Sequence, residues 1–348
     1  MDTVHNPVPA TVDAIIVPTG RPVAYLQSAM KLAKYHQCTL VTISSRSSTA
    51  ADVRALAARE GLADLIAVDA TEIGEHVPEF ATTNLLRDTK FDRRTDTSQK
   101  RNFGLLLSRM VGWEHVVFLD DDIDIPAPHD LAGAVGSLGR FASVGLTING
   151  YPDNSVVCHA YRIAGGRQDT FIGGGALAVG VESFNSFFPN IYNDDWFFLL
   201  NDHGLRPSAF TTGVVEQSSY DPFHDPTRAR SEELGDSLAE GLYMLLDDTQ
   251  RLDTANYAYW ARFLSRRLKF IDEIVTFVGD TALPQPEKER MIESLKAAKG
   301  RNLVIEPQLC VDYLDAWRLD RKLWREHINV APEQLGVEKT LAELGLIR

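Results

Sequence analysis

An alternation of short apolar runs and helical patterns fills the first part of the chain. Apolar runs occur within residues 13–22, 38–48 and 62–71, and the segments between them, 23–36 and 49–61, space their apolar residues as one face of a helix. Apolar strands joined by helices form parallel sheets that are covered on both faces. The sequence therefore predicts an α/β fold, in which ligands bind at the carboxyl ends of the strands.

The alternation continues less regularly up to about residue 225. Residues 1–12 are expected to be a loose lead-in, and the polar, irregular stretch at 72–98 is expected to be a loop. Helical spacing over 98–113 then leads into an apolar strand at 115–120. The remaining elements expected in this part are strands within 143–150, 169–180 and 209–217 and a short helix within 188–204.

From residue 231 the pattern is helical throughout. A leucine stripe at positions 234, 238, 242 and 245 begins it, and further helices are expected within 255–279, 286–300 and 309–328. Pro286 suits a helix start and Gly300 a helix end. We therefore divide the chain into a catalytic domain at 1–230 and an all-helical extension at 231–348. We expect the extension to pack on the catalytic domain or on a partner subunit, which leaves a homo-oligomer as one option. The mixture of aromatic and basic residues in YAYWARFLSRRLKF leaves contact with a membrane surface as the alternative.

Composition and charge exclude several classes of protein. The chain of 348 residues is 44% hydrophobic, which suffices for a large core, and its formal net charge of -13 argues against sequence-blind nucleic-acid binding. Cys38, Cys158 and Cys310 lie far apart, so neither a disulfide framework nor a zinc–thiolate site is indicated. The first residues carry no basic stretch and no long apolar run. We therefore expect a cytoplasmic protein with no signal peptide and no integral membrane segment.

A cluster of aspartates follows the strand at 115–120. The stretch VVFLDDDIDIP, residues 116–126, contains Asp120, Asp121, Asp122 and Asp124. Carboxylates this close repel each other, and a divalent cation would offset the repulsion. Mn²⁺ or Mg²⁺ takes oxygen ligands, of which a diphosphate can supply several. The alternative is a set of turn and helix-cap carboxylates, as is common before prolines.

The order of motifs along residues 13–225 resembles that of GT-A glycosyltransferases of the family 2 type. The resemblance rests on IIVPTGRP, QKRNFGLLLSRMVGWEHVVFLDDDI, GGGALAV and NDDWFFLLNDHG, in this order. It implies a Rossmann-like mixed sheet flanked by helices, to which this chain adds its helical extension. It also implies transfer of a sugar, with hexosyl transfer expected, from a nucleotide-diphospho-sugar to an acceptor hydroxyl.

The resemblance also implies roles for individual residues on the donor side. In such enzymes the Asp-x-Asp motif holds the ribose and the metal-bound diphosphate of the donor. The donor-binding residues carried over are Thr19, Arg21, Arg101, Asn102, Asp120 and Asp121, and the metal ligands are Asp120, Asp122 and His224. A solvated helix face for Arg101 and Asn102, and a surface-loop histidine for His224, are the alternatives. The segment ISSRSS lacks the acidic residue that holds the base in many relatives, so the choice between UDP- and GDP-sugars stays open.

On the acceptor side the resemblance points to a glycine run and an acidic pair. Gly173, Gly174 and Gly175 would form the floor below the reacting sugar, and a plain turn is the alternative. Asp194 and Asp195 match the acidic pair whose second member commonly deprotonates the acceptor hydroxyl. Their alternative role is helix capping. The sequence does not identify the acceptor. If His224 binds the metal, sugar transfer with retention at the anomeric carbon is favoured over inversion.

Three further functions compete with a metal-dependent glycosyltransferase. A sugar-phosphate nucleotidyltransferase has a similar sheet but should carry a glycine-rich loop after its first strand, where VPTGRP supplies one glycine. A phosphohydrolase also uses Asp-x-Asp after a strand, although that motif usually opens its domain. A non-catalytic module would bind a nucleotide-sugar without turning it over.

Overall fold

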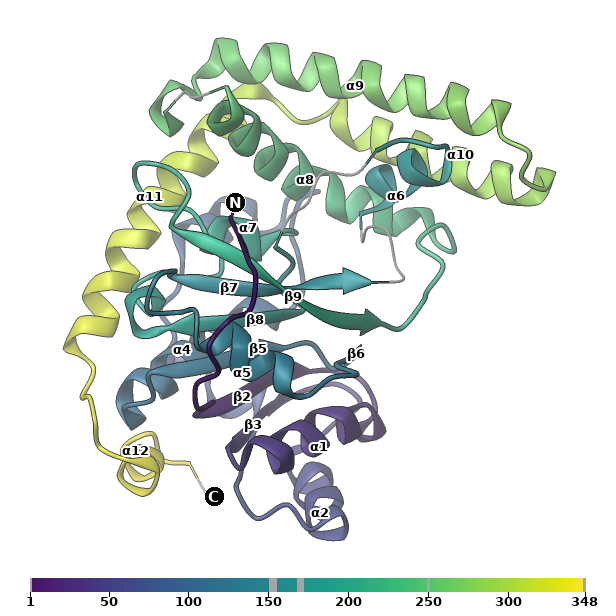
Figure 1. The fold of residues 1–348 in the computed structure, drawn as a ribbon. Helices are drawn as coiled ribbons and strands as arrows, with labels where there is room; N and C mark the ends of the chain where they lie inside the picture. Colours follow the sequence, from purple (N-terminus) through teal and green to yellow (C-terminus); the bar gives the residue numbers. More distant parts are fainter. Residues whose placement is uncertain (1, 150–154, 168–171, 249–250, 347–348) are drawn as a thin grey trace.

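The computed structural model describes residues 2–149, 155–167, 172–248 and 251–346, so parts of the expected strands at 143–150 and 169–180 lie outside the described residues. Within these ranges a nine-stranded sheet has the order β1-β9-β7-β8-β5-β2-β3-β4, with β6 beside β9 (Figure 1). The strands are β1 (Asp2–Val4), β2 (Ala14–Thr19), β3 (Thr39–Ser44), β4 (Leu65–Asp69), β5 (His115–Leu119), β6 (Ile123–Asp124), β7 (Ser143–Asn149), β8 (Ala176–Gly180) and β9 (Ser208–Gln217).

Helices flank this sheet, so the mixed α/β class expected from the sequence is confirmed. The sheet is parallel from β5 through β2 and β3 to β4, as predicted, and β8 runs antiparallel to both β5 and β7. The helices are α1 (Gln27–His36), α2 (Ala50–Glu60), α3 (Ala81–Leu86), α4 (Thr97–Val111), α5 (His129–Val135), α6 (Val156–Ile163), α7 (Asp194–Phe198), α8 (Pro226–Asp247), α9 (Tyr257–Asp280), α10 (Gln285–Asn302), α11 (Pro307–Val330) and α12 (Val337–Glu343).

The core has two layers because successive strand residues face opposite sides of the sheet. Ile15 and Val17 of β2 pack with α1, α2 and α5, whereas Ile16 packs with α4 and the helices behind it. Gly104 brings α4 close to the sheet, since a Cβ there would lie 2.9 Å from Cγ2 of Ile16 and 3.1 Å from the Phe118 ring. This close packing fixes α4, which carries Arg101, above the carboxyl end of β5.

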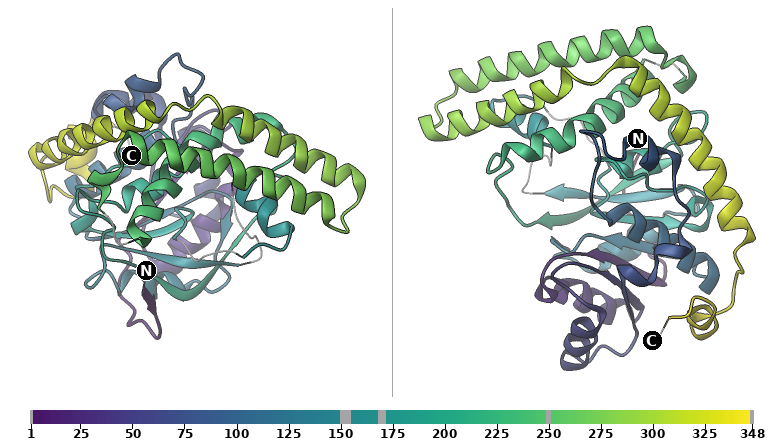
Figure 2. Two further views of the ribbon diagram at one scale, coloured as in Figure 1. Left: turned by 90° about the horizontal axis from the view of Figure 1, so that it is seen from above. Right: turned by 180° about the vertical axis from the view of Figure 1, so that it is seen from behind.

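The C-terminal helices form a separate layer against the sheet and its covering helices. The α9 and α10 helices lie antiparallel and extend beyond the sheet, while α11 runs down the side of the molecule toward α12 (Figure 2). The α8 helix packs against α10 and begins at Pro226, so it crosses the boundary placed between residues 230 and 231. Among the described residues, no helix is both long and apolar enough to span a bilayer.

Four sequence expectations about elements were wrong. The lead-in contains β1, which pairs in parallel with β9, and the expected loop at 72–98 contains α3. The helix that carries the leucine stripe begins at Pro226 rather than after residue 230, because Asp225 caps it and Pro226 fits its first turn. The α10 helix continues past Gly300 to Asn302. The partners of β1 and α3 are distant in sequence, which hid these two elements from local patterns.

Candidate active site

A cavity of about 1560 Å³ opens at the carboxyl ends of β2 and β5. Its wall combines loops of the sheet with residues from α4, α6, α7 and α8. Most residues proposed from the sequence meet in this wall, namely Thr19, Arg21, Arg101, Asp120, Asp121, Asp122, Gly173, Gly174, Gly175, Asp194 and Asp195. The folding of the chain thus brings the aspartate cluster, the glycine run and the acidic pair to one place.

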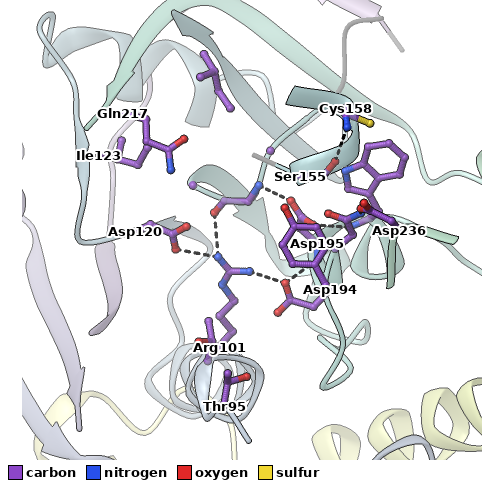
Figure 3. Close-up of a pocket in the computed structure, with 18 of the residues that line it drawn as sticks. Thr95, Arg101, Asp120, Ile123, Ser155, Cys158, Asp194, Asp195, Gln217 and Asp236 are labelled. Carbon is purple, nitrogen blue, oxygen red and sulfur yellow. Dashed lines mark hydrogen bonds and ion pairs between the residues drawn. The ribbon is translucent and has the colours of Figure 1, made fainter. Parts of the chain in front are cut away.

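A buried arginine joins the aspartate cluster to the acidic pair. Arg101 is 5% exposed and lies between Asp120 and Asp194 (Figure 3). It donates hydrogen bonds to the carboxylates of Asp120 at 2.8 Å and Asp194 at 2.9 Å, and to the carbonyl of Gly174 at 3.4 Å. Burial alone would lower the pKa of Arg101, but the two carboxylates raise it above its usual value. The guanidinium is therefore a permanent positive charge that fixes three segments of the site.

The glycine run contacts both the aspartate cluster and the acidic pair. The amide of Asp120 donates to the Gly175 carbonyl at 2.9 Å, next to the start of β8. The amide of Gly174 donates to Oδ2 of Asp195 at 2.5 Å, and a Cβ at position 174 would lie 2.9 Å from Cβ of Asp195. A glycine is therefore required at position 174 for this close contact.

The two carboxylates of the acidic pair have different surroundings. Asp194 accepts from Arg101 and, at 3.2 Å, from the hydroxyl of Ser98, so its charge is compensated. Within the described residues, Asp195 accepts hydrogen bonds from two backbone amides, those of Gly174 and, at 2.9 Å, Trp196. Burial, and then the negative charge of Asp194, raises the pKa of Asp195 to about 6. Asp195 can therefore exchange a proton near neutral pH.

The turn that carries the acidic pair is held by the C-terminal helices. Asn193 adopts a left-handed conformation with φ 62° and ψ 38°, which asparagine tolerates better than most residues. Its side-chain amide donates to Asp236 of α8 at 2.8 Å, and Asp236 pairs with Arg267 of α9 at 3.2 Å. Asp194 and Asp195 follow directly, so residues beyond position 230 determine where these carboxylates point.

Asp121 and Asp122 are compensated by Arg21. Asp121 accepts from the Thr19 hydroxyl at 2.7 Å and pairs with Arg21, which also lies 3.1 Å from Asp122. Burial raises the pKa of Asp120, which Arg101 counteracts. In this structure, Arg21 and Arg101 together offset the repulsion among the neighbouring carboxylates of Asp120, Asp121 and Asp122.

The cluster has the chemistry of a divalent-cation site but supplies only part of one. Within the described residues, no three side chains of His, Cys, Asp or Glu are arranged around a common metal position. Of Asp120, Asp121 and Asp122, Asp122 has the longest contacts, at 3.1 Å to Arg21 and 3.5 Å to Gln217. Carboxylate oxygens are ligands that Mn²⁺ and Mg²⁺ accept, so the residues fit such an ion when a phosphate supplies further oxygens.

Two residues proposed from the sequence do not line the cavity. Asn102 is fully buried and uses its side chain on the backbone of Phe188, donating to the carbonyl and accepting from the amide, both at 2.8 Å. It therefore fixes the loop before α7 to α4 and cannot contact a donor. His224 is exposed in the turn before α8 and lies outside the cavity wall, which removes the geometric basis for a third metal ligand.

Several residues of the cavity were missed by the sequence analysis. Lys100 is 2% exposed and donates to the Thr19 carbonyl and the Ser45 hydroxyl, both at 2.7 Å, which fixes the loop after β2. Lys100 could have been proposed from the sequence because it directly precedes Arg101 in QKRN. Asp236 and Glu240 of α8 also line the cavity. Nothing in the sequence indicated that Asp236 and Glu240 line the cavity, because they belong to a helix that was assigned to the extension and not to the site.

Comparison with known proteins adds evidence on the fold. Neither a known protein-family model nor a curated protein matches the sequence. Among solved structures, the mannosyltransferase PcManGT from Pyrobaculum calidifontis, in complex with GDP-Man and Mn²⁺, is similar with a TM-score of 0.50. The identity is 15%, and the match covers 86% of this chain and 90% of that chain. At this identity the likeness concerns the fold: this chain has an overall architecture similar to that of a glycosyltransferase.

Proposed function

We propose that this protein is a metal-dependent glycosyltransferase of the GT-A, family 2 type. It would move a hexosyl group from a UDP- or GDP-sugar to an acceptor hydroxyl. The observation that carries the proposal is the connection of Asp120, Arg101, Asp194 and the Gly174–Asp195 contact in one cavity wall. The fold likeness to a mannosyltransferase supports it.

The donor would bind across the ends of β2 and β5. Asp120 and Asp121 would contact the nucleotide side, with Thr19 and Arg21 beside them. Asp122, with Asp120, would hold Mn²⁺ or Mg²⁺ together with the diphosphate. The ion, when bound, neutralises charge on the departing nucleoside diphosphate. Burial lowers the pKa of Arg21, but the carboxylates of Asp122 and Asp121 raise it above its usual value, so its guanidinium is a permanent cation. Its side chain is 48% exposed and would turn to the diphosphate when the donor binds.

The acceptor would approach from the side of the acidic pair. Asp195 would take the proton of the attacking hydroxyl, because its pKa of about 6 leaves it ionised at neutral pH yet basic enough to react. Asp194 would position Arg101 rather than react. Gly174 would hold Asp195 beside the sugar, as the close backbone contact requires.

We propose that the two parts of the chain, 1–230 and 231–348, both contribute to the active site. A catalytic part at 1–230 would carry the donor site, and the extension at 231–348 would complete the acceptor side through Asp236 and Glu240, which line the cavity. A homo-oligomer through the extension stays a prediction.

The test is a thermal-shift titration with UDP, GDP and their sugars, with and without Mn²⁺. A nucleotide at 100 times its Kd stabilises the native state by about 2.7 kcal/mol. We expect Asp122→Ala to abolish the manganese-dependent part of this shift while the unliganded unfolding temperature stays the same. Asp280→Ala, which removes an exposed carboxylate at the end of α9, is the matched control.

Reaction products separate the alternatives. Sugar transfer with release of a nucleoside diphosphate supports the proposal. Release of pyrophosphate from a nucleoside triphosphate and a sugar phosphate would identify a nucleotidyltransferase, and release of phosphate from simple phosphomonoesters a phosphohydrolase. Unchanged manganese-dependent affinity in Asp122→Ala would refute the proposed metal site.

A further inference from the structure

A second cavity of about 220 Å³ adjoins the first and shares Arg93 and Tyr192 with it. Water occupies roughly 30 Å³ per molecule in the liquid, so this side cavity has space for one small oxyanion or one end of a larger ligand. Its wall comes from four segments: the stretch before α4, the loop before α7, the first turns of α8, and the end of α10.

Positive charge dominates the wall of the side cavity. Lys90, Arg93, Arg230 and Arg301 line it, and Asp92 is the carboxylate among the described lining residues. Asp92 forms its salt bridge with Arg94, at 3.5 Å. Within the described part of the chain, none of the four cations of the wall has a carboxylate within salt-bridge distance. The protein has a net charge of -13, so this local excess of cations runs against its overall composition.

Arg93 and Arg301 are held in place by aromatic rings, although no carboxylate of the described residues lies within salt-bridge distance of them. The Arg301 guanidinium lies over the Phe91 ring at 5.3 Å, and that of Arg93 over the Tyr192 ring at 5.6 Å. Nε of Arg301 is buried and has no hydrogen-bond partner in the described structure. Burial, and then repulsion from Arg230, lowers the pKa of Arg301. Guanidinium groups stacked on aromatic rings, one of them with an unused Nε donor, are suited to bind an oxyanion.

The backbone contributes to the same preference. Thr227 lines the side cavity from the first turn of α8, a 22-residue helix whose amino-terminal end favours negative charge, and Arg230 and Ser231 follow in the next turn. Gly235 permits the close approach of α8 to the opposite wall, since a Cβ there would lie 2.2 Å from the Tyr192 carbonyl. The helix dipole and the arginines therefore act on the same space.

We propose that the side cavity binds a phosphate group and that this group is carried by the acceptor. The shared wall at Arg93 and Tyr192 would place the rest of such a molecule in the main cavity, on the side of the acidic pair. The assignment to the acceptor rests on the proposed function, whereas phosphate binding itself does not.

The first experiment measures binding without metal or donor. Isothermal titration with inorganic phosphate, at constant ionic strength in chloride, is made on the full chain and on the double variant Arg230→Gln/Arg301→Gln. Charged hydrogen bonds of this kind predict a loss of affinity of about tenfold or more for the double variant. The control, Arg59→Gln/Arg262→Gln, changes the net charge equally at exposed positions on α2 and α9 and should leave the affinity unchanged.

The variant is expected to fold, because it removes cations that have no carboxylate partner, and its thermal unfolding checks this. GDP binding with Mn²⁺ should be the same in the variant and the wild type, which separates the side cavity from the donor site. Phosphate affinity equal in the wild type and the folded double variant, or no phosphate binding by the wild type, would overturn the proposal.

The second experiment identifies the source of the phosphate. Glycerol 3-phosphate, which joins a phosphate to hydroxyl groups, is compared with inorganic phosphate and with glycerol. Tighter binding of glycerol 3-phosphate than of either, lost in the double variant, supports a phosphate-bearing acceptor. Equal affinities for inorganic phosphate and glycerol 3-phosphate would assign the site to free phosphate and overturn the acceptor part. A phosphate site that persists in a protein without sugar transfer would refute the proposed function alone.

Discussion

Asp194 and Asp195 are chemically identical neighbours, yet the fold gives them different tasks. Asp194 contacts the permanent charge of Arg101, whereas Asp195 contacts backbone amides and faces the negative charge of its neighbour. The first therefore serves as a structural anchor for Arg101. The second has a pKa of about 6 and gains or loses a proton near physiological pH.

The pH dependence of transfer follows from this pKa. A base must be ionised, so kcat should fall as the pH drops through about 6, where Asp195 becomes protonated. Asp195→Asn should lower kcat by about 100- to 10,000-fold and leave donor binding intact. Steady-state rates between pH 4.5 and 8, with donor affinity measured in parallel, check both. Transfer at the wild-type rate in Asp195→Asn would remove this residue from the catalytic mechanism.

At the same scale, the sequence predicted which acidic and glycine residues meet, but not every neighbour. Asp120 was predictable because it follows a buried strand, and ligands bind at the carboxyl ends of such strands. Gly174 and Asp195 were expected at the site only from the resemblance in the order of motifs. Asn102 was misassigned because nothing in QKRN shows which helix face meets the cavity and which meets Phe188. That distinction depends on how α4 rotates against the sheet, which long-range packing decides.

Among the elements, α8 has the widest influence because it lines both cavities. Its position depends on Gly235, which allows the helix to pack directly against the backbone of Tyr192. The neighbouring element α10 also contains a glycine, Gly300, but no atom lies within 4 Å of where its Cβ would be. These two glycines have the same helical context and different packing.

Replacing each by alanine should therefore have opposite effects. Gly235→Ala places a methyl group against the Tyr192 carbonyl, and we expect it to lower the free energy of unfolding by about 1–3 kcal/mol. Gly300→Ala should raise it by roughly 0.5–1 kcal/mol, because alanine favours the helix. Urea unfolding followed by circular dichroism measures both. A Gly235→Ala protein as stable as the wild type would contradict the tight contact.

Short elements were the least predictable from the sequence. The first amides of α3, those of Ala81 and Thr82, donate to the carboxylate of Asp320 at 2.7 and 2.8 Å. A capping residue normally precedes its helix, and here it comes from α11. Similarly, β1 becomes a strand only because β9 offers its edge. The long helices and buried strands were predictable because their periodicity is local.

In the molecule as a whole, a buried charge network connects the C-terminal helices to the cavity. Arg267 of α9 is 3% exposed and pairs with Glu233 at 2.6 Å, Asp236 at 3.2 Å and Glu240 at 2.5 Å. Burial raises the pKa of Asp236, and Arg267 counteracts this rise. Asp236 in turn holds Asn193, so the network links the outer helices to the acidic pair.

Loss of the central cation should therefore affect stability and the site together. Arg267→Gln leaves buried carboxylates without their partner, and we expect a loss of about 3–5 kcal/mol in the free energy of unfolding. Arg266→Gln, at the exposed neighbouring position, should change it by less than about 0.5 kcal/mol. Chemical unfolding of both variants tests the difference. Equal stabilities would show that the network contributes little.

The pairing of β1 with β9 has a consequence for how the chain folds during synthesis. Asp2 lies opposite Ala209, so the partner of the first strand is made roughly ten to forty seconds later at ordinary translation rates of about 5–20 residues per second. Contacts between residues far apart in sequence slow folding. The cap that Asp320 provides for α3 forms later still, because Asp320 lies 239 positions after Ala81. In the nascent protein, β1 therefore stays without its partner strand until the middle of the chain has left the ribosome.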